Sequence, residues 1–238
     1  MGIYKARLTR KEVVARDTIA LYFTKPEGFS YVAGQFLRLT LIHMQETDPR
    51  GNFRYFSIAS APFENEVCIA TRLRDTAFKH ALENVPSDYE VEIQGPFGKF
   101  ILDDTESVPA VFLAGGIGIT PFRSMLAQGI QTGLQRQIFL FYANKKMEDA
   151  AFFTEISIWA KMNSNFIFIP IMTQEDNTSW QGEIGHITEN TLRKYLQEVK
   201  RYVYYIAGPP EMVSSIKEVL APLGTQENQI KVENFTGY

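Results

Sequence analysis

The fold of this chain is decided by one stretch, Val111-Phe112-Leu113-Ala114-Gly115-Gly116-Ile117-Gly118-Ile119-Thr120-Pro121. Its apolar start has no polar interruption, which is typical of a strand buried on both faces of a parallel sheet. Glycines follow the apolar run, and Thr120 and Pro121 have the residue types of a helix N-cap and a first helical position. The stretch therefore predicts a buried strand, a tight turn and a helix that begins at residue 120.

This turn has the properties of an anion site. The N–H groups at a helix N-terminus converge on the preceding turn, and the helix dipole adds about half a positive charge there. Glycine lets a diphosphate approach the backbone because it has no Cβ. The dinucleotide fingerprint would place a further glycine where this chain has Pro121, so the match is to a variant. We favour nucleotide binding, with an ordinary strand–helix connection as the alternative.

Length and composition narrow the class of protein. The 238 residues suffice for one large or two small domains, and the net charge of −3 gives no basic footprint for nucleic acid. Cys68 is the single cysteine, so neither an internal disulfide nor a cluster ligated by four cysteines can form within this sequence. The histidines show no metal-ligand spacing, so we expect no metal site. No apolar run reaches membrane-spanning length, and we expect a cytoplasmic protein without a membrane span.

The pattern of predicted elements changes at the acidic stretch 103–107. Before it, period-two alternation and turn residues predict strands at 18–24, 36–41, 67–73 and 89–94, with one helix at 77–84. After it, strands at 110–114, 138–142, 166–169, 202–206 and 230–235 alternate with helices near 120–132, 148–161, 189–199 and 211–220. We therefore predict two domains: an antiparallel Greek-key β-barrel over residues 1–104, then an α/β domain with a doubly wound parallel sheet over residues 105–238.

Motifs in both domains resemble those of the ferredoxin–NADP(+) reductase family. In order along the chain they are Arg54-x-Phe56-Ser57, Gly95-Pro96-Phe97-Gly98, the glycine stretch 115–121 and Gly208-Pro209-Pro210. The resemblance covers essentially the whole chain. It implies that the barrel binds FAD, that the second domain binds NAD(P), and that hydride passes between the two cofactors.

For the barrel, the resemblance implies a set of flavin contacts. Arg54 would hold the FAD pyrophosphate, for which a permanently charged fork is suited. Ser57 would place its hydroxyl near flavin N5, and Phe56, which replaces the family's usual tyrosine, would stack on the flavin. The remaining implied flavin contacts are Ile58, Ala70, Thr71, Phe78 and Lys79.

For the second domain, the resemblance implies that Gly116, Gly118 and Thr120 cradle the pyrophosphate of the nicotinamide nucleotide. Gly208 and Pro209 would lie near the nicotinamide, where Ala207 replaces the family's usual cysteine. Glu233 would be a polar or proton-relay group, although an edge-strand charge is nearly as good a reading. Tyr238 would lie over the flavin face or belong to a frayed terminus. The candidate catalytic residues are thus Ser57, Ala207 and Glu233.

The nucleotide preference depends on the end of the second parallel strand. An acidic residue there favours NAD, and a basic residue suits the 2′-phosphate of NADP. The sequence is Tyr142-Ala143-Asn144-Lys145-Lys146, with no acid before Glu148. We therefore expect Asn144 and Lys145 to contact NADP, and because the lysines could equally be solvated, NAD stays open.

The sequence as a whole predicts an FAD-dependent oxidoreductase. It would take hydride from NAD(P)H and pass electrons to a separate acceptor such as ferredoxin or flavodoxin. Two alternatives remain: a non-enzymatic nucleotide-sensing module, and an electron-transfer subunit of a larger flavoprotein complex.

Overall fold

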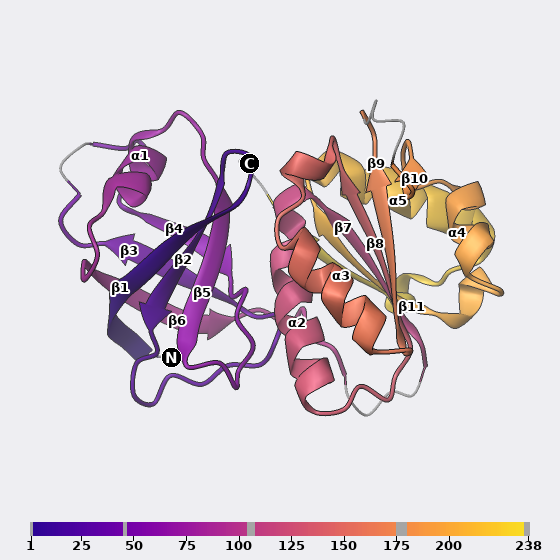
Figure 1. The fold of residues 1–238 in the computed structure, drawn as a ribbon, viewed down its shortest axis with the longest axis horizontal. Coiled ribbons are helices and arrows are strands. Elements are labelled where there is room, and N and C mark those ends of the chain that lie inside the picture. The colour runs from indigo at the N-terminus through magenta and orange to yellow at the C-terminus, as the bar shows by residue number, and fades with distance from the viewer. Residues whose placement is uncertain (1, 45–46, 104–107, 175–179, 236–238) are drawn as a thin grey trace. The chain divides into compact units, whose positions relative to one another are not determined.

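The computed structural model describes residues 2–44, 47–103, 108–174 and 180–235. The chain divides into two compact units, shown in Figure 1. The first comprises Met1–Leu102 and Thr120–Gln128, and the second comprises Asp103–Ile119 and Gly129–Tyr238. The boundary expected at 104/105 falls within residues 104–107, outside the described residues, and stays a prediction. The sequence predicts one boundary, whereas the structure assigns residues 120–128, which follow that boundary, to the first unit.

The first unit contains a six-stranded antiparallel sheet in the order β4-β3-β6-β1-β2-β5. This barrel-like sheet confirms the expected class of the first domain. Its strands are β1 (Gly2–Ala15), β2 (Thr18–Thr24), β3 (Phe36–Leu41), β4 (Phe53–Ser57), β5 (Glu66–Arg72) and β6 (Glu90–Phe97), and its helix is α1 (Ala77–Asn84).

The core of this unit joins buried side chains of all six strands with those of α1. Strand β3 alternates in burial, and its leucines at 37, 39 and 41 are fully buried. They share one apolar cluster with Phe78 and Leu82 of α1. Helix α1 begins at residue 77 because Thr76 has an extended backbone and its side chain accepts a hydrogen bond from Lys79 N at 3.3 Å.

Strand β1 was not among the expected strands. Of its side chains, Ala6 and Leu8 are buried while most others are exposed, so no long apolar alternation marks it in the sequence. It forms because its backbone pairs with β2 on one side and β6 on the other. Charged side chains cross to the neighbouring strand on its outer face, as in the 2.8 Å pair of Lys5 Nζ and Glu90 Oε1.

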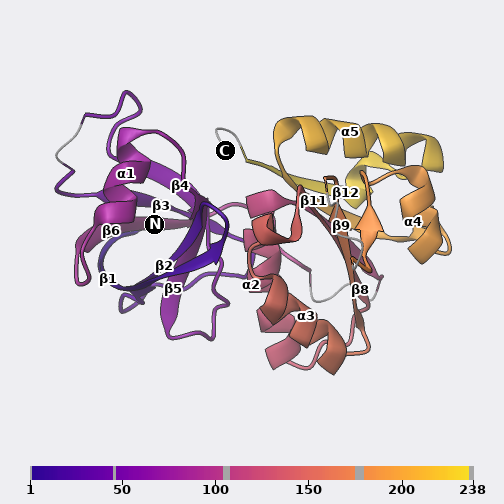
Figure 2. The ribbon, with the colours of Figure 1, turned by 45° about the horizontal axis from the view of Figure 1, so that its top comes forward.

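The second unit contains a six-stranded parallel sheet in the order β10-β9-β8-β7-β11-β12. Its strands are β7 (Ala110–Gly115), β8 (Ile138–Asn144), β9 (Phe166–Met172), β10 (Glu183–Ile184), β11 (Val203–Gly208) and β12 (Ile230–Asn234). Figures 1 and 2 show α3 (Phe153–Met162) on one face of this sheet, with α4 (Glu189–Tyr195) and α5 (Pro210–Leu220) on the other. The doubly wound parallel sheet is confirmed.

Two expected helices are shorter than the sequence predicts. The helix expected over 148–161 is split into a 3-10 turn, Met147–Asp149, and α3, because Phe152 has a left-handed backbone with φ of 59° between them. The helix expected over 189–199 ends at Tyr195, and a separate 3-10 turn follows at Val199–Arg201.

The helix of the glycine stretch begins earlier than the sequence predicts. A 3-10 turn, Gly116–Ile119, runs directly into α2 (Thr120–Gln131). Thr120 is therefore inside a continuous helical segment and is not its N-cap. The N–H groups that lack helical acceptors are those near Gly116, because the first turn of a helix leaves its donors unpaired.

Candidate functional site

The first unit brings two hydrogen-bond donors of the predicted flavin site onto one carboxylate. Arg54, on β4, donates from Nη2 to Oδ1 of Asp48 at 2.6 Å. Phe78 N, in the first turn of α1, donates to Oδ2 of the same carboxylate at 3.0 Å. The Arg54 guanidinium also lies over the Phe78 ring, 4.6 Å from its centre. A permanent cation and a helix N-terminal amide thus form an anion cradle, by which we mean Arg54 and Phe78 N.

Asp48 was not among the expected site residues. Its sequence context, Asp48-Pro49-Arg50-Gly51, indicates a turn, and the turn is present: Arg50 N donates to Asp48 Oδ1 at 2.8 Å. The residue is 7% exposed. Burial acts to raise the pKa of its carboxyl, but the hydrogen bonds from Arg50 N, Phe78 N and Arg54 outweigh burial and hold that pKa below the usual value.

The guanidinium of Arg54 is held from a second side. Its Nη1 donates to three carbonyl oxygens of the β3–β4 loop and of β4, those of Arg50 at 3.3 Å, Gly51 at 3.0 Å and Phe53 at 2.6 Å. Both terminal nitrogens of Arg54 therefore have acceptors within the protein.

Lys79 adds a second cation beside the cradle. Its side chain is 6% exposed, donates to the Thr71 hydroxyl and lies 5.0 Å from the centre of the Phe56 ring. Burial, with a smaller contribution from neighbouring arginine charges, lowers the pKa of Lys79 to about 7. Phe56 is buried and stacks on Phe78 with ring centres 6.4 Å apart. The structure therefore groups Arg54, Phe56, Thr71, Phe78 and Lys79 into one cluster.

This cluster fits a phosphate-bearing cofactor. A guanidinium fork and a helix N-terminal amide are the donors that bind phosphate oxygens in proteins. The Asp48 carboxylate is a stand-in for such an anion, since it accepts from both donors. The other predicted flavin residues, Ser57, Ile58 and Ala70, are buried at the end of β4, just after it and on β5.

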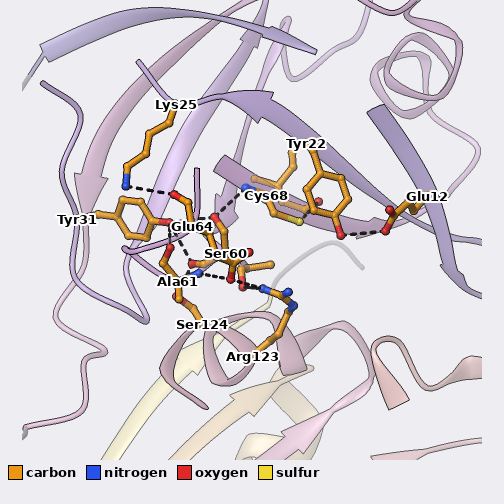
Figure 3. A network of polar contacts seen from close by, with 12 residues as sticks. Glu12, Tyr22, Lys25, Tyr31, Ser60, Ala61, Glu64, Cys68, Arg123 and Ser124 are labelled. Carbon is orange, nitrogen blue, oxygen red and sulfur yellow. Dashed lines mark hydrogen bonds and ion pairs between the residues drawn. The ribbon is translucent and has the colours of Figure 1, made fainter. Parts of the chain in front are cut away.

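The segment after Ser57 is held by α2, in a network that Figure 3 shows. Arg123 Nη1 donates to Ala59 O at 2.8 Å and to Glu64 Oε1 at 2.9 Å. The Ser124 hydroxyl donates to Ser60 O at 2.6 Å, and the Tyr31 hydroxyl lies 2.9 Å from Ser60 Oγ. No local sequence pattern predicts these pairs, because their partners are 29 to 64 positions apart.

In the second unit, two glycines of the predicted nucleotide turn have different roles. Gly116 has a φ of 52°, which other residues rarely adopt, and a Cβ there would meet nothing within 4 Å. A Cβ on Gly118 would lie 2.3 Å from Ala207 O, so this glycine allows the turn to pack against the end of β11. The absence of a Cβ at Gly118 thus leaves room for the backbone of β11, and the expected contact of Gly118 with the pyrophosphate stays a prediction. Thr120 is 1% exposed.

The carboxyl ends of β7 and β11 form the edge of the parallel sheet where a ligand is expected. The strand order reverses between these neighbours, and ligands of doubly wound sheets bind beyond the carboxyl ends of the strands at such a point. Gly115 and Gly208 end the two strands, and a Cβ on Gly208 would lie 3.3 Å from Gly115 Cα. Ala207 is fully buried and is in register with Glu233 on β12, so two of the predicted catalytic residues are adjacent. Pro209 follows as the N-cap of α5.

Asn144 ends β8 with a buried, unsatisfied amide. It is 6% exposed, and neither Oδ1 nor Nδ2 has a hydrogen-bond partner among the described residues. The neighbouring Ala143 is in register with Gly115, so this amide lies at the same edge of the sheet as the glycine turn. A buried amide without partners is costly, and a ligand with hydroxyl groups would satisfy it. Lys145 is exposed. Tyr238 lies outside the described residues.

The described part of the chain holds no cluster of metal-ligating side chains. No group of three or more histidine, cysteine, aspartate or glutamate side chains there could hold a metal ion. Cys68 is fully buried, and burial raises the pKa of its thiol to about 12. Within the same residues, no helix is long and apolar enough to span a bilayer.

The sequence matches one protein-family model, the oxidoreductase NAD-binding domain, over residues 112–218. Among curated proteins it is 27% identical to the reductase component of propane 2-monooxygenase of Rhodococcus jostii, over 98% of this chain and 63% of that protein. It is 28% identical to the phenol 2-monooxygenase reductase component DmpP of a Pseudomonas strain, over 86% of this chain and 58% of that protein. The chain thus spans about 60% of the length of these relatives.

Solved structures share the whole two-unit fold. A ferredoxin NADP+ reductase from Neisseria gonorrhoeae with bound FAD and NADP superposes with a TM-score of 0.81 at 21% identity, covering 98% of this chain and 99% of that one. The FAD/NAD-binding domain of a nitric oxide dioxygenase from Vibrio cholerae gives a TM-score of 0.83 at 17% identity, covering 98% of both chains. These likenesses establish the fold: it is that of the ferredoxin–NADP(+) reductase-like proteins, as the sequence motifs predicted.

Proposed function

We propose that the chain is an FAD-dependent NAD(P)H oxidoreductase, because residues 112–218 match the model of the oxidoreductase NAD-binding domain and the chain has the ferredoxin–NADP(+) reductase-like fold. The observation that carries the proposal is the anion cradle. Arg54 and Phe78 N converge on one carboxylate in the unit where the sequence motifs expect the FAD pyrophosphate.

FAD, when bound, supplies a group that accepts a hydride and releases electrons one at a time. The residues of this chain bind and orient. The Arg54 fork and the α1 N-terminus would hold phosphate oxygens, Lys79 in its protonated form would add positive charge, and the Ser57 hydroxyl would donate a hydrogen bond toward flavin N5. The apolar cluster around Phe56 excludes water from the ring system.

In the second unit, the N–H groups at Gly116 hold the pyrophosphate of the nicotinamide nucleotide at the helix N-terminus. The Asn144 amide satisfies its buried donor and acceptor on the ribose side, and Lys145 favours a 2′-phosphate, so NADPH is the preferred donor and NADH the weaker one. Ala207 would lie beside the nicotinamide, and Glu233 lies next to it in register.

Electrons leave for a separate protein, in this proposal ferredoxin, flavodoxin or an oxygenase component. The curated relatives named above are reductase components, which supports such a partner.

The experiment is reconstitution of the purified protein with FAD, followed by flavin fluorescence. Arg54→Gln is expected to weaken FAD binding about 10- to 100-fold, because it removes a charge-assisted bond of about 1.5–3 kcal/mol. Arg38→Gln is the control: it also removes one arginine from the sheet, but Arg38 lies over the Phe53 ring, 3.8 Å from its centre, and bonds to Gln94. Equal affinity of Arg54→Gln and wild type would remove the cradle from the proposed site.

A further inference from the structure

Asp48 occupies the donors that a diphosphate would use. Its Oδ1 accepts from Arg54 Nη2 and from Arg50 N, and its Oδ2 accepts from Phe78 N. Its side chain is 3% exposed, so the carboxylate is enclosed within the cradle and is not a surface charge near it.

The cradle has little capacity for a second anion. Arg54 Nη1 is committed to the carbonyl oxygens of Arg50, Gly51 and Phe53, which leaves Nη2 as the terminal nitrogen that faces Asp48. The single N–H of Phe78 has one hydrogen to donate, and Asp48 accepts it. A phosphate oxygen that binds Phe78 N must therefore replace a carboxylate oxygen, and one that binds Arg54 Nη2 must lie directly beside that carboxylate.

Charge strengthens this exclusion. Two anions a few ångströms apart in a buried site repel each other, and each disfavours the charged form of the other. A carboxylate with three hydrogen bonds keeps its charge at neutral pH, so a diphosphate does not find a neutral neighbour in its place.

We propose that Asp48 is an internal competitor for the flavin diphosphate: its carboxylate holds Arg54 and the α1 N-terminus in the free protein, and FAD binds by displacing it. The proposal rests on the proposed function, because it assigns the cradle to the diphosphate. Asp48 then sets how tightly this protein holds its flavin, and it keeps the cradle assembled when flavin is absent.

The test compares FAD affinity of the flavin-free protein and its variants by quenching of flavin fluorescence. Asp48→Asn keeps the shape and an acceptor oxygen but removes the charge, and it is expected to bind FAD at least about tenfold more tightly than wild type. Asp75→Asn is the matched control. This variant removes the same charge just before α1, but the Asp75 side chain is fully exposed and pairs with His80. The affinity of Asp75→Asn for FAD should therefore stay within about twofold of wild type.

Two further measurements keep the result decisive. In an Arg54→Gln background, Asp48→Asn should raise the affinity for FAD by a smaller factor than it does in wild type. The reason is that the two residues act through one contact, so their effects are not additive. Inorganic pyrophosphate should raise the thermal midpoint of flavin-free Asp48→Asn more than that of wild type. If Asp48→Asn does not fold, Asp48→Ser, which also removes the charge, replaces it in both measurements.

The outcomes separate this inference from the proposed function. One outcome is that wild type binds FAD, Arg54→Gln weakens this binding and Asp48→Asn leaves it unchanged. That outcome would overturn the role of Asp48 as a competitor, while the proposed flavin site would stand. Weaker binding by Asp48→Asn would likewise overturn it and make Asp48 a residue that positions Arg54. If neither wild type nor Asp48→Asn binds FAD, both proposals fail.

Discussion

Arg123 of α2 forms an ion pair with Glu64, with 2.9 Å between Nη1 and Oε1, and the same nitrogen donates to Ala59 O. Figure 3 shows how this arginine reaches the segment that follows the predicted flavin strand. The side chains of the pair are 8% and 24% exposed. The helix of the glycine stretch is therefore tied to the antiparallel sheet by a largely buried charge pair.

Arg123→Met is expected to destabilise the protein strongly. Removing one partner of a buried pair leaves the other charge uncompensated and costs about 3–5 kcal/mol. Chemical denaturation followed by circular dichroism measures the loss. Arg193→Met is the control, because Arg193 forms an exposed pair with Glu189 one helical turn away, and such pairs contribute about 0.3–0.5 kcal/mol. Equal losses in the two variants would show that burial of the Arg123 pair is unimportant.

Gly118→Ala is expected to cost more stability than Gly116→Ala. The added methyl at 118 would lie 2.3 Å from Ala207 O, which is backbone and cannot move aside, so the cost should reach about 3 kcal/mol, the upper end of overpacking. At 116 the space is open and the left-handed backbone costs an alanine about 1 kcal/mol. Thermal unfolding of both variants gives the order, and the reverse order would contradict the packing role of Gly118.

Lys79→Met is expected to change how stability depends on pH. The pKa of Lys79 is about 7 in the folded protein, below its ordinary value of 10.5. Below pH 7 the ammonium is charged in both the folded and the unfolded protein, and burying this charge destabilises the folded protein. Between pH 7 and 10 the folded state releases its proton first, so the unfolded state binds more protons and wild-type stability rises with pH relative to the variant, by up to about 1.4 kcal/mol per pH unit.

Denaturation of the flavin-free proteins at pH 6.5, 8 and 9.5 measures that difference. The free energy of unfolding of Lys79→Met should exceed that of wild type most at pH 6.5. The difference between the two proteins should close at pH 9.5. The control is Lys99→Met, since Lys99 is exposed and its loss changes the net charge equally. Parallel curves for wild type and Lys79→Met would contradict a lowered pKa.

Asn144→Leu is expected to separate stability from nucleotide binding. Leucine has a similar volume and removes two buried polar atoms that have no partner among the described residues, which should stabilise the nucleotide-free protein by about 1–3 kcal/mol. The same change should raise KM for NADPH about tenfold or more with little change in kcat. A variant with unaltered KM would show that Asn144 does not contact the nucleotide.

Local signals predicted much of this fold. The bounds of β2, β3 and α1 agree with the predicted ranges, because period-two alternation in the strands and Thr76 before the helix are encoded within a few residues. Strand β1 was missed for the opposite reason. Its outer face carries charges that neighbouring strands pair, and pairing between strands distant in sequence leaves no local apolar pattern.

The candidate site divides in the same way. Arg54, Phe56, Thr71, Phe78 and Lys79 come from three separate segments, and the family motifs placed them in one site that the contacts then brought together. Neither the family motifs nor a local pattern predicted Asp48, because its turn is an ordinary one and its partner Phe78 lies 30 positions away. The packing of Gly118 against the β11 backbone at Ala207 could not be predicted either, because these two residues are distant in sequence.

The most direct test of the central claim is an anaerobic visible spectrum of the FAD-reconstituted protein, titrated separately with NADPH and NADH. The account predicts flavin absorption bands that bleach with NADPH, and with NADH at higher concentration. A protein that stays colourless after FAD is added, or bound flavin that neither nucleotide bleaches, would contradict it and leave a nucleotide-binding module without reductase activity.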